Sequence, residues 1–120
     1  MKTNRIIISG SRNYNDYYYF EKKVNKMLST LDKTDLEIVS GCAIGPDTMA
    51  IRYAKENNIP IKRFPAEWSK YGKGAGMIRN ELMAAYSTHC IAFWDRASRG
   101  TENMIIQAKK KDLKLRIVRI

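Results

Sequence analysis

Apolar residues are spaced along the chain in two alternating ways. Five short, mainly apolar runs are separated by stretches in which apolar residues return every three or four positions. The first spacing is typical of buried strands, and the second of amphipathic helices with one face on a core. The runs predict strands over residues 5–9, 36–39, 59–64, 89–94 and 113–120. The stretches between them predict helices over about 15–31, 46–56 and 75–86, and from Gly100 onward.

Capping residues and helix breakers support these boundaries. Residues 13–16 offer capping side chains for the first helix, and Pro46 suits the first position of the second. Pro65 ends the third strand because proline cannot donate to a β-ladder. Thr101 is the predicted cap of the last helix. In the helix over 75–86, the positions expected to be buried are Ile78, Leu82 and either Ala85 or Tyr86.

Strands that alternate with helices over the whole length predict an α/β protein with a parallel sheet. We expect one Rossmann-like three-layer αβα domain over residues 1–120, with a five-stranded, mainly parallel sheet. The run over 89–94 is apolar almost throughout, which is typical of a central strand. Cations at Lys114, Arg116 and Arg119 suit an edge strand that must resist pairing with another chain.

Composition places the chain among globular proteins with one core. It has 120 residues, of which 44% are hydrophobic and 28% charged. No apolar run approaches the length of a membrane span, and the first residues do not resemble a signal peptide, so we expect a cytoplasmic protein that does not contact membranes. Cys42 and Cys90 lack metal-site spacing and are expected to be reduced and structural. The sequence predicts neither a metal nor a cofactor.

The charge balance favours a partner that carries phosphate. Lys and Arg number 22 against 12 Asp and Glu, so the formal net charge is +10. Such an excess favours a nucleotide or a nucleic acid strand without choosing between them. Part of it has another explanation, because cations such as those over 109–111 complement a helix dipole.

Three glycine-bearing turns follow predicted strands, at residues 9–12, 41–47 and 98–101. The carboxyl ends of parallel strands meet at one edge of a sheet, where ligands of such folds bind. A strand that turns tightly into a helix also directs backbone N–H groups outward, which suits a phosphate. The alternative is that these turns are ordinary strand-to-helix connections.

Two aromatic clusters and one arginine are further candidates for ligand contact. The loop over 66–76 contains three glycines with Trp68 and Tyr71. The tyrosines over 17–19 could stack on a base, or could open a helix whose apolar face meets the sheet. Arg79 lies in an otherwise apolar helix and therefore needs an anionic partner, either a ligand or an internal carboxylate such as Asp47 or Asp95.

In their order along the chain, these features resemble the SLOG superfamily, which joins the DNA-processing protein DprA to the LOG-type cytokinin-activating enzymes. The likeness is strongest to its small phage and bacterial branch of unassigned function. The residues that carry it are Gly10-Ser11-Arg12, the segment over 40–47, the segment over 64–68, Gly72-Lys73, Ala75-Gly76, Arg79-Asn80 with Met83, the segment over 93–95, and Ser98-Arg99-Gly100-Thr101.

The resemblance implies a nucleotide or nucleotide-derived ligand at the carboxyl-terminal edge of the sheet. The phosphate-binding residues it implies are Gly10, Ser11, Arg12, Gly41, Cys42, Ala43, Gly45, Asp47, Lys73, Arg79, Asn80, Ser98, Arg99, Gly100 and Thr101. Trp68, Tyr71 and Trp94 are the base-stacking candidates. By analogy with its relatives, the chain is also expected to form a homo-oligomer.

The sequence supports three functional hypotheses. The first is a protein that captures a nucleotide or a nucleotide second messenger, to sense or sequester it. The second is a LOG-like hydrolase of nucleoside monophosphates, with Arg79, Glu102 and Asp95 as catalytic candidates. LOG enzymes have a glutamate three residues after the threonine of the last turn, where this chain has Met104. The third is DprA-like binding of nucleic acid.

Overall fold

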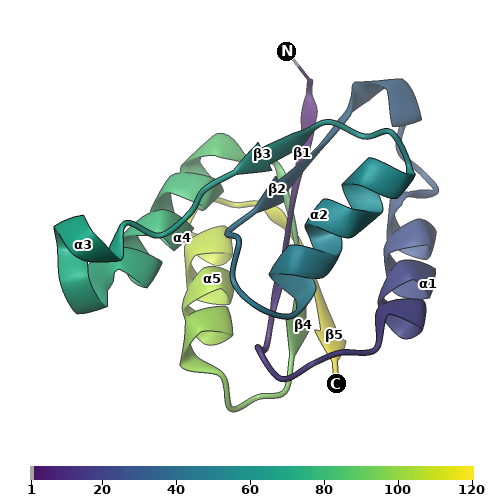
Figure 1. The fold of residues 1–120 in the computed structure, drawn as a ribbon. Helices are drawn as coiled ribbons and strands as arrows, with labels where there is room; N and C mark the ends of the chain where they lie inside the picture. The colour runs from purple at the N-terminus through teal and green to yellow at the C-terminus, as the bar shows by residue number, and fades with distance from the viewer. Residues whose placement is uncertain (1) are drawn as a thin grey trace.

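The computed structural model describes residues 2–120. Strands and helices alternate along the chain, as Figure 1 shows. In chain order they are β1 (Asn4–Gly10), α1 (Tyr17–Leu28), the 3-10 turn η1 (Lys33–Asp35), β2 (Leu36–Ser40), α2 (Pro46–Glu56), β3 (Ile61–Arg63), α3 (Trp68–Tyr71), the 3-10 turn η2 (Gly72–Gly74), α4 (Ala75–Tyr86), β4 (His89–Trp94), α5 (Arg99–Lys110) and β5 (Lys114–Arg119).

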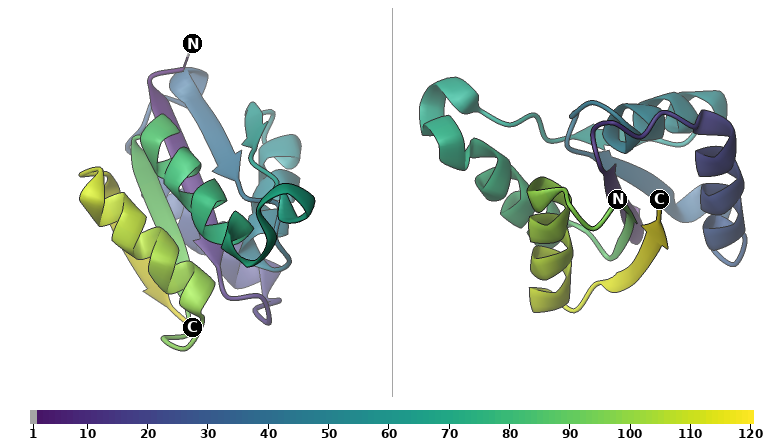
Figure 2. Two further views of the ribbon diagram at one scale, coloured as in Figure 1. Left: turned by 90° about the vertical axis from the view of Figure 1, so that its left-hand side faces the viewer. Right: turned by 90° about the horizontal axis from the view of Figure 1, so that it is seen from below.

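The five strands form one sheet in the order β3-β2-β1-β4-β5, and each neighbouring pair is parallel. Helices α1 and α2 cover one face and α4 and α5 cover the other (Figure 2). After β3 the chain crosses back to the other side of β1, so strand order reverses between β1 and β4. This is the predicted Rossmann-like three-layer arrangement, and the sheet is parallel throughout.

The core has two halves because successive residues of a strand face opposite sides of the sheet. Ile6 and Ile8 pack with Phe20 and Val24 beneath α1. Ile7, between them in sequence, packs with Met83 and other side chains of α4 and α5. β1 is therefore apolar on both faces, as a central strand covered on both sides must be.

Several element boundaries differ from the predictions. The loop expected over 66–76 contains the helical turn α3 and the 3-10 turn η2, and Ser98, rather than Thr101, caps α5. In α4 the buried residues are Ala75, Asn80, Met83 and Ala84, whereas the predicted Leu82 is 55% exposed. The predicted bounds of α4 are confirmed, but its buried positions were predicted wrongly, because Met83 and small residues pack on the sheet and Asn80 bonds to α5.

The two cysteines are free, and Cys90 is buried within β4. Burial raises the pKa of its thiol to about 12, so this cysteine behaves as a small apolar core residue. No helix within residues 2–120 combines the length and the hydrophobicity that crossing a membrane requires.

Candidate functional site

The first predicted turn is bound directly to the end of β4, which leads into the third predicted turn. The Ser11 backbone N–H donates to the Phe93 carbonyl over 2.9 Å, and the Ser11 hydroxyl accepts the Asp95 N–H over 3.1 Å. These bonds join the ends of β1 and β4, where the strand order reverses. The first and third turns therefore share one edge of the sheet, as predicted.

Two glycines are required where the second turn crosses the end of β1. A Cβ on Gly10 would lie 2.6 Å from the Phe93 carbonyl oxygen, and one on Gly45 would lie 2.8 Å from the Ser11 carbonyl oxygen. Gly45 also has φ of +92°, a conformation that side chains disfavour. Both positions thus allow the turn that opens α2 to pack directly on the turn that follows β1.

Asp47 lies at the centre of these turns and is only 3% exposed. The backbone N–H groups of Gly10, Gly41 and Ala43 are directed at its carboxylate and lower its pKa, as does Arg79, but desolvation outweighs them. The net effect raises the pKa of Asp47 to about 6. The protein therefore directs three of the expected phosphate donors at a carboxylate of its own.

Ser40 supports the same turn, and sequence reasoning missed it. Its buried hydroxyl donates to the Asp47 carbonyl over 2.7 Å and accepts the Cys42 N–H over 3.1 Å. Cys42 has a left-handed φ of +64°, a conformation that is uncommon for residues other than glycine. A serine placed between an apolar strand and a glycine turn was the available signal.

Arg79, in the first half of α4, is the principal cation of the edge. Its guanidinium donates to the Gly41 carbonyl and, over 2.9 Å, to the Asn80 side-chain oxygen. Among residues 2–120 the ion pairs within 4.0 Å are Arg52–Glu56 and Lys70–Glu67, so Arg79 and Asp47 do not form a close pair. Burial lowers the pKa of Arg79, the charge of Asp47 partly opposes this, and the charge of Arg12 adds a smaller lowering effect.

Asn80 joins α4 to the start of α5. Its side-chain amide is 4% exposed and donates to the Gly100 carbonyl over 3.2 Å and to the Asn103 side chain over 3.0 Å. Asn103 is another residue that sequence reasoning missed. Through Arg79 and Asn80, α4 therefore bridges the second turn and the third.

Other predicted residues stabilise the third turn from within. The Asp95 carboxylate accepts the N–H groups of Ala97 and Ser98, each over 2.8 Å, and these bonds lower its pKa. Thr101 is buried beside the Ser98 hydroxyl, and the Trp94 indole N–H donates to the Ser98 carbonyl. Asp95 is thus engaged in the turn, whereas Glu102 is exposed in the first turn of α5.

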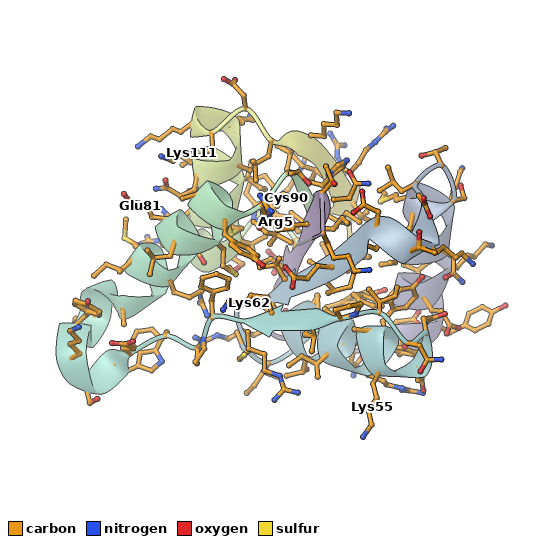
Figure 3. All side chains as sticks on the ribbon, turned by 90° about the horizontal axis from the view of Figure 1, so that it is seen from above. Arg5, Lys55, Lys62, Glu81, Cys90 and Lys111 are labelled. Atoms are coloured by element: carbon orange, nitrogen blue, oxygen red, sulfur yellow. The ribbon has the colours of Figure 1, made fainter. Side chains whose placement is uncertain are left out.

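A groove of about 240 Å³ runs from Arg79 along the end of β3. Lys62, Phe64 and Tyr71 are among its lining residues, and Figure 3 shows Lys62 on the α4 side of β3. Trp68 packs near Gly76 at the start of α4. Lys73 belongs to η2, in the segment that projects from the body of the molecule in Figure 1.

Comparisons with known proteins identify a family and a relative that this chain resembles. The family described as "YspA, cpYpsA-related SLOG family" matches residues 4–71, which include the first two turns. The Gene 61 protein of Mycobacterium phage D29 is 31% identical over 112 residues, covering 88% of this chain and 89% of the phage protein.

Two solved structures share the fold. DNA processing protein A of Streptococcus pneumoniae matches with a TM-score of 0.74 and 19% identity, over 97% of this chain and 50% of that one. DNA processing protein A of Helicobacter pylori, described for its single-stranded DNA binding mode, matches with a TM-score of 0.66 and 21% identity, over 97% of this chain and 65% of that one. This chain therefore spans about half to two thirds of these larger proteins.

Proposed function

Because the chain belongs to the YspA, cpYpsA-related SLOG family, we propose that it binds a nucleotide or nucleotide-derived ligand through phosphate at the carboxyl-terminal edge of its sheet. Arg79 is the main contact in this proposal and Arg12 supports it. The N-terminus of α5 supplies further backbone donors. The ligand remains outside the space that the Asp47 carboxylate occupies.

The observation that carries the proposal is the surroundings of the Arg79 guanidinium. It is half-buried, lies within electrostatic range of the Asp47 carboxylate and of a second cation, Arg12, and makes no close ion pair among the described residues. Two of its nitrogens donate to Gly41 and Asn80, which fixes its position. A phosphate on its remaining nitrogen would gain a charge-assisted hydrogen bond and offset the repulsion between the two arginines.

Single-stranded nucleic acid is the second candidate ligand. The groove that leads from Arg79 is lined by the cations Lys62 and Arg63 and by the aromatic rings of Phe64 and Tyr71. Cations that follow a backbone, together with rings on which bases stack, are the usual means of binding single strands. The similar fold of the Helicobacter pylori protein, described for its single-stranded DNA binding mode, supports the same possibility.

Calorimetry with a panel of ligands tests the proposal. The panel contains AMP, ADP-ribose, NAD, cyclic dinucleotides and a twelve-residue oligothymidylate, with adenosine as the control that lacks phosphate. We expect at least one phosphate ligand to bind, and adenosine to bind much more weakly. Arg79→Gln should lower the affinity for the phosphate ligand by about tenfold or more, as expected for loss of a charge-assisted hydrogen bond.

Lys55→Gln is the matched control because it also removes one positive charge, but at the far end of α2, where Lys55 points outward (Figure 3). It should leave the affinity unchanged. Tighter binding of the oligothymidylate than of any monomer, with a steep salt dependence, would select nucleic acid as the ligand. The proposal fails if no phosphate ligand binds, or if folded Arg79→Gln protein binds it as tightly as the natural chain.

A further inference from the structure

A second, larger groove lies at the opposite end of the sheet from Arg79. It has a volume of about 660 Å³ and is bounded by the last turns of α1 and by the first residues of β4 and β5. Helix α1 and strand β5 face one another in the right-hand view of Figure 2. The topology leaves this space open because α1 lies over the middle of the sheet and no helix on that face covers β5.

The walls of this groove are basic on both sides. Lys23 and Lys26 line it from α1, and Lys114 and Arg116 line it from β5. The two β5 side chains share a sheet face with the buried Val118, because they lie two and four residues before it. They replace the apolar residues that a covered strand would have there.

The positive charge of the groove is not neutralised locally. Its lining within residues 2–120 contains no Asp or Glu, and none of its four cations belongs to either ion pair of that part of the chain. His89, at the start of β4, lies opposite Lys114 in the strand register. Burial lowers the pKa of His89, and the charge of Lys114 lowers it further, so the imidazole reports on the charge of this groove.

The floor of the groove is aliphatic. The buried Ile6 and Ile91 of the sheet lie beneath it, and the half-buried Met27 and Leu31 give it accessible apolar surface from the α1 side. Within the described chain the lining includes no Phe, Tyr or Trp, so it lacks the rings on which bases of a single strand stack. An apolar floor between two basic walls complements a segment with apolar side chains on one side and carboxylates along its edges.

We propose that this groove, between α1 and the start of β5, is a docking site for an acidic peptide segment of a partner protein. Apolar side chains of the segment would rest on the half-buried Met27 and Leu31. Its carboxylates would pair with Lys23 and Lys26 on one side and with Lys114 and Arg116 on the other. The site is separate from the nucleotide edge and does not depend on the function proposed there.

The only histidine of the chain makes the proposal directly testable by NMR. The probe is a capped twelve-residue peptide of alternating Glu-Glu and Leu-Leu pairs, titrated while the His89 ring signals are followed. We expect saturable shifts of these signals and a rise in the pKa of His89, because bound carboxylates stabilise the imidazolium. A peptide of the same pattern with Lys in place of Glu should produce neither effect.

Charge-reversal variants locate the contact. Lys26→Glu/Lys114→Glu should lower the affinity for the acidic peptide by about tenfold or more, since each wall loses a cation and gains a negative charge that repels the peptide. Lys22→Glu/Lys55→Glu has the same net charge, lies outside the groove lining, and should reduce affinity much less. Circular dichroism verifies that both double variants are folded.

Three results would overturn the proposal. The first is peptide binding that leaves the His89 signals unchanged, because the peptide would then lie elsewhere. The second is equal weakening in the two double variants, which would indicate general attraction to a basic protein. The third is a twelve-residue oligothymidylate that shifts His89 at lower concentration than the peptide does, because the groove would then be a nucleic-acid surface.

Discussion

Asp47 is the residue that most changes the view of the candidate site. The sequence offered it as a possible internal partner of Arg79, and the family resemblance placed it among the phosphate-site residues. The structure adds that the turn encloses it and that its pKa is raised to about 6. Sequence could not reveal this, because the groups that surround Asp47 come from the ends of β1 and β2 and from α4.

The raised pKa predicts a specific pH dependence of ligand affinity. At pH 7.5 the Asp47 carboxylate is charged and repels an incoming phosphate, whereas below about pH 6 it is neutral. A phosphodiester ligand, which does not titrate in this range, should therefore bind more tightly as pH falls from 7.5 to 5.0. In Asp47→Asn the affinity at pH 7.5 should approach the low-pH value of the natural chain, as measured by fluorescence anisotropy.

A pH profile that has the same shape in both proteins would contradict this role of Asp47. His89 provides an internal check, because it is a second group with a shifted pKa, lowered by burial and by Lys114, but lies at the other end of the sheet. His89→Gln should keep the pH dependence of the natural chain.

Substitution by alanine should have different effects at two glycines of the turns. Gly10→Ala places a methyl group 2.6 Å from the Phe93 carbonyl, and the backbone must shift to accommodate it. We expect it to lower the free energy of unfolding by about 1–3 kcal/mol, the usual cost of overpacking. Gly100→Ala has no atom within 4 Å of the new carbon, so its free energy of unfolding should change little. Urea denaturation measures both.

Equal stability of these two variants would contradict the packing of the second turn on the first. Sequence alone could not separate the glycines, since each follows or precedes a predicted strand or helix in a similar small-residue turn. The difference arises because Pro46 and Phe93 crowd Gly10, whereas the side of Gly100 is open.

Secondary-structure elements could be predicted well where one physical pattern decides them. The bounds of α2 and β4 agree with the expected ranges, because a proline opens α2 and β4 is a continuous apolar run. The bounds of α4 also agree with the expected range, but its buried face was harder to predict. That face contains Ala75, Asn80 and Ala84, which do not stand out in a hydrophobic pattern. Asn80 on that face bonds to the start of α5 and to Arg79, which in turn bonds to Gly41, so these side chains link the second and third turns.

The cap of α5 gives a prediction at the level of one helix. The Ser98 hydroxyl accepts the Thr101 N–H at the start of α5 and also contacts the Thr101 hydroxyl. Ser98→Ala should lower the free energy of unfolding by about 1 kcal/mol, the typical cost of losing a cap. Thermal and urea denaturation measure this, with Ser69→Ala, on the exposed turn α3, as a control that should change little.

If Ser98→Ala leaves the free energy of unfolding unchanged, Ser98 is not the functional cap, and Thr101 would take that role as the sequence predicted. The sequence permitted either residue, since both are hydroxyl side chains near a glycine. Their relative position within the turn, which the Asp95 carboxylate fixes through Ala97 and Ser98, decides between them.

On the scale of the whole molecule, the positive charge is distributed over distinct places. Arg12 and Arg79 lie at the carboxyl-terminal edge of the sheet, and Lys23, Lys26, Lys114 and Arg116 surround the groove at its other end. Others, such as Lys109 and Lys110, lie in the last turn of a helix and complement its dipole, as predicted. The cations behind the net charge of +10 therefore lie in at least three kinds of place: the Arg79 edge, the second groove and the ends of helices. Composition alone could not distinguish them.

Self-association remains a prediction. Trp68, Met77 and Leu82 are more than half exposed on the segment formed by α3 and α4, next to the candidate edge. Exposed apolar side chains are a common feature of association surfaces. Sedimentation velocity of the natural chain and of Leu82→Glu would show whether this segment joins copies.

The most direct test of the central claim, that phosphate binds at the carboxyl-terminal edge near Arg79, is an NMR map of the bound ligand. Amide and arginine side-chain signals of the isotope-labelled chain would be followed during titration with the tightest ligand of the calorimetric panel. We predict the largest shifts at Arg12, Gly45, the Arg79 side chain and Gly100, with His89 unaffected. Shifts confined to the other end of the sheet, or an unperturbed Arg79 side chain at saturation, would contradict the account.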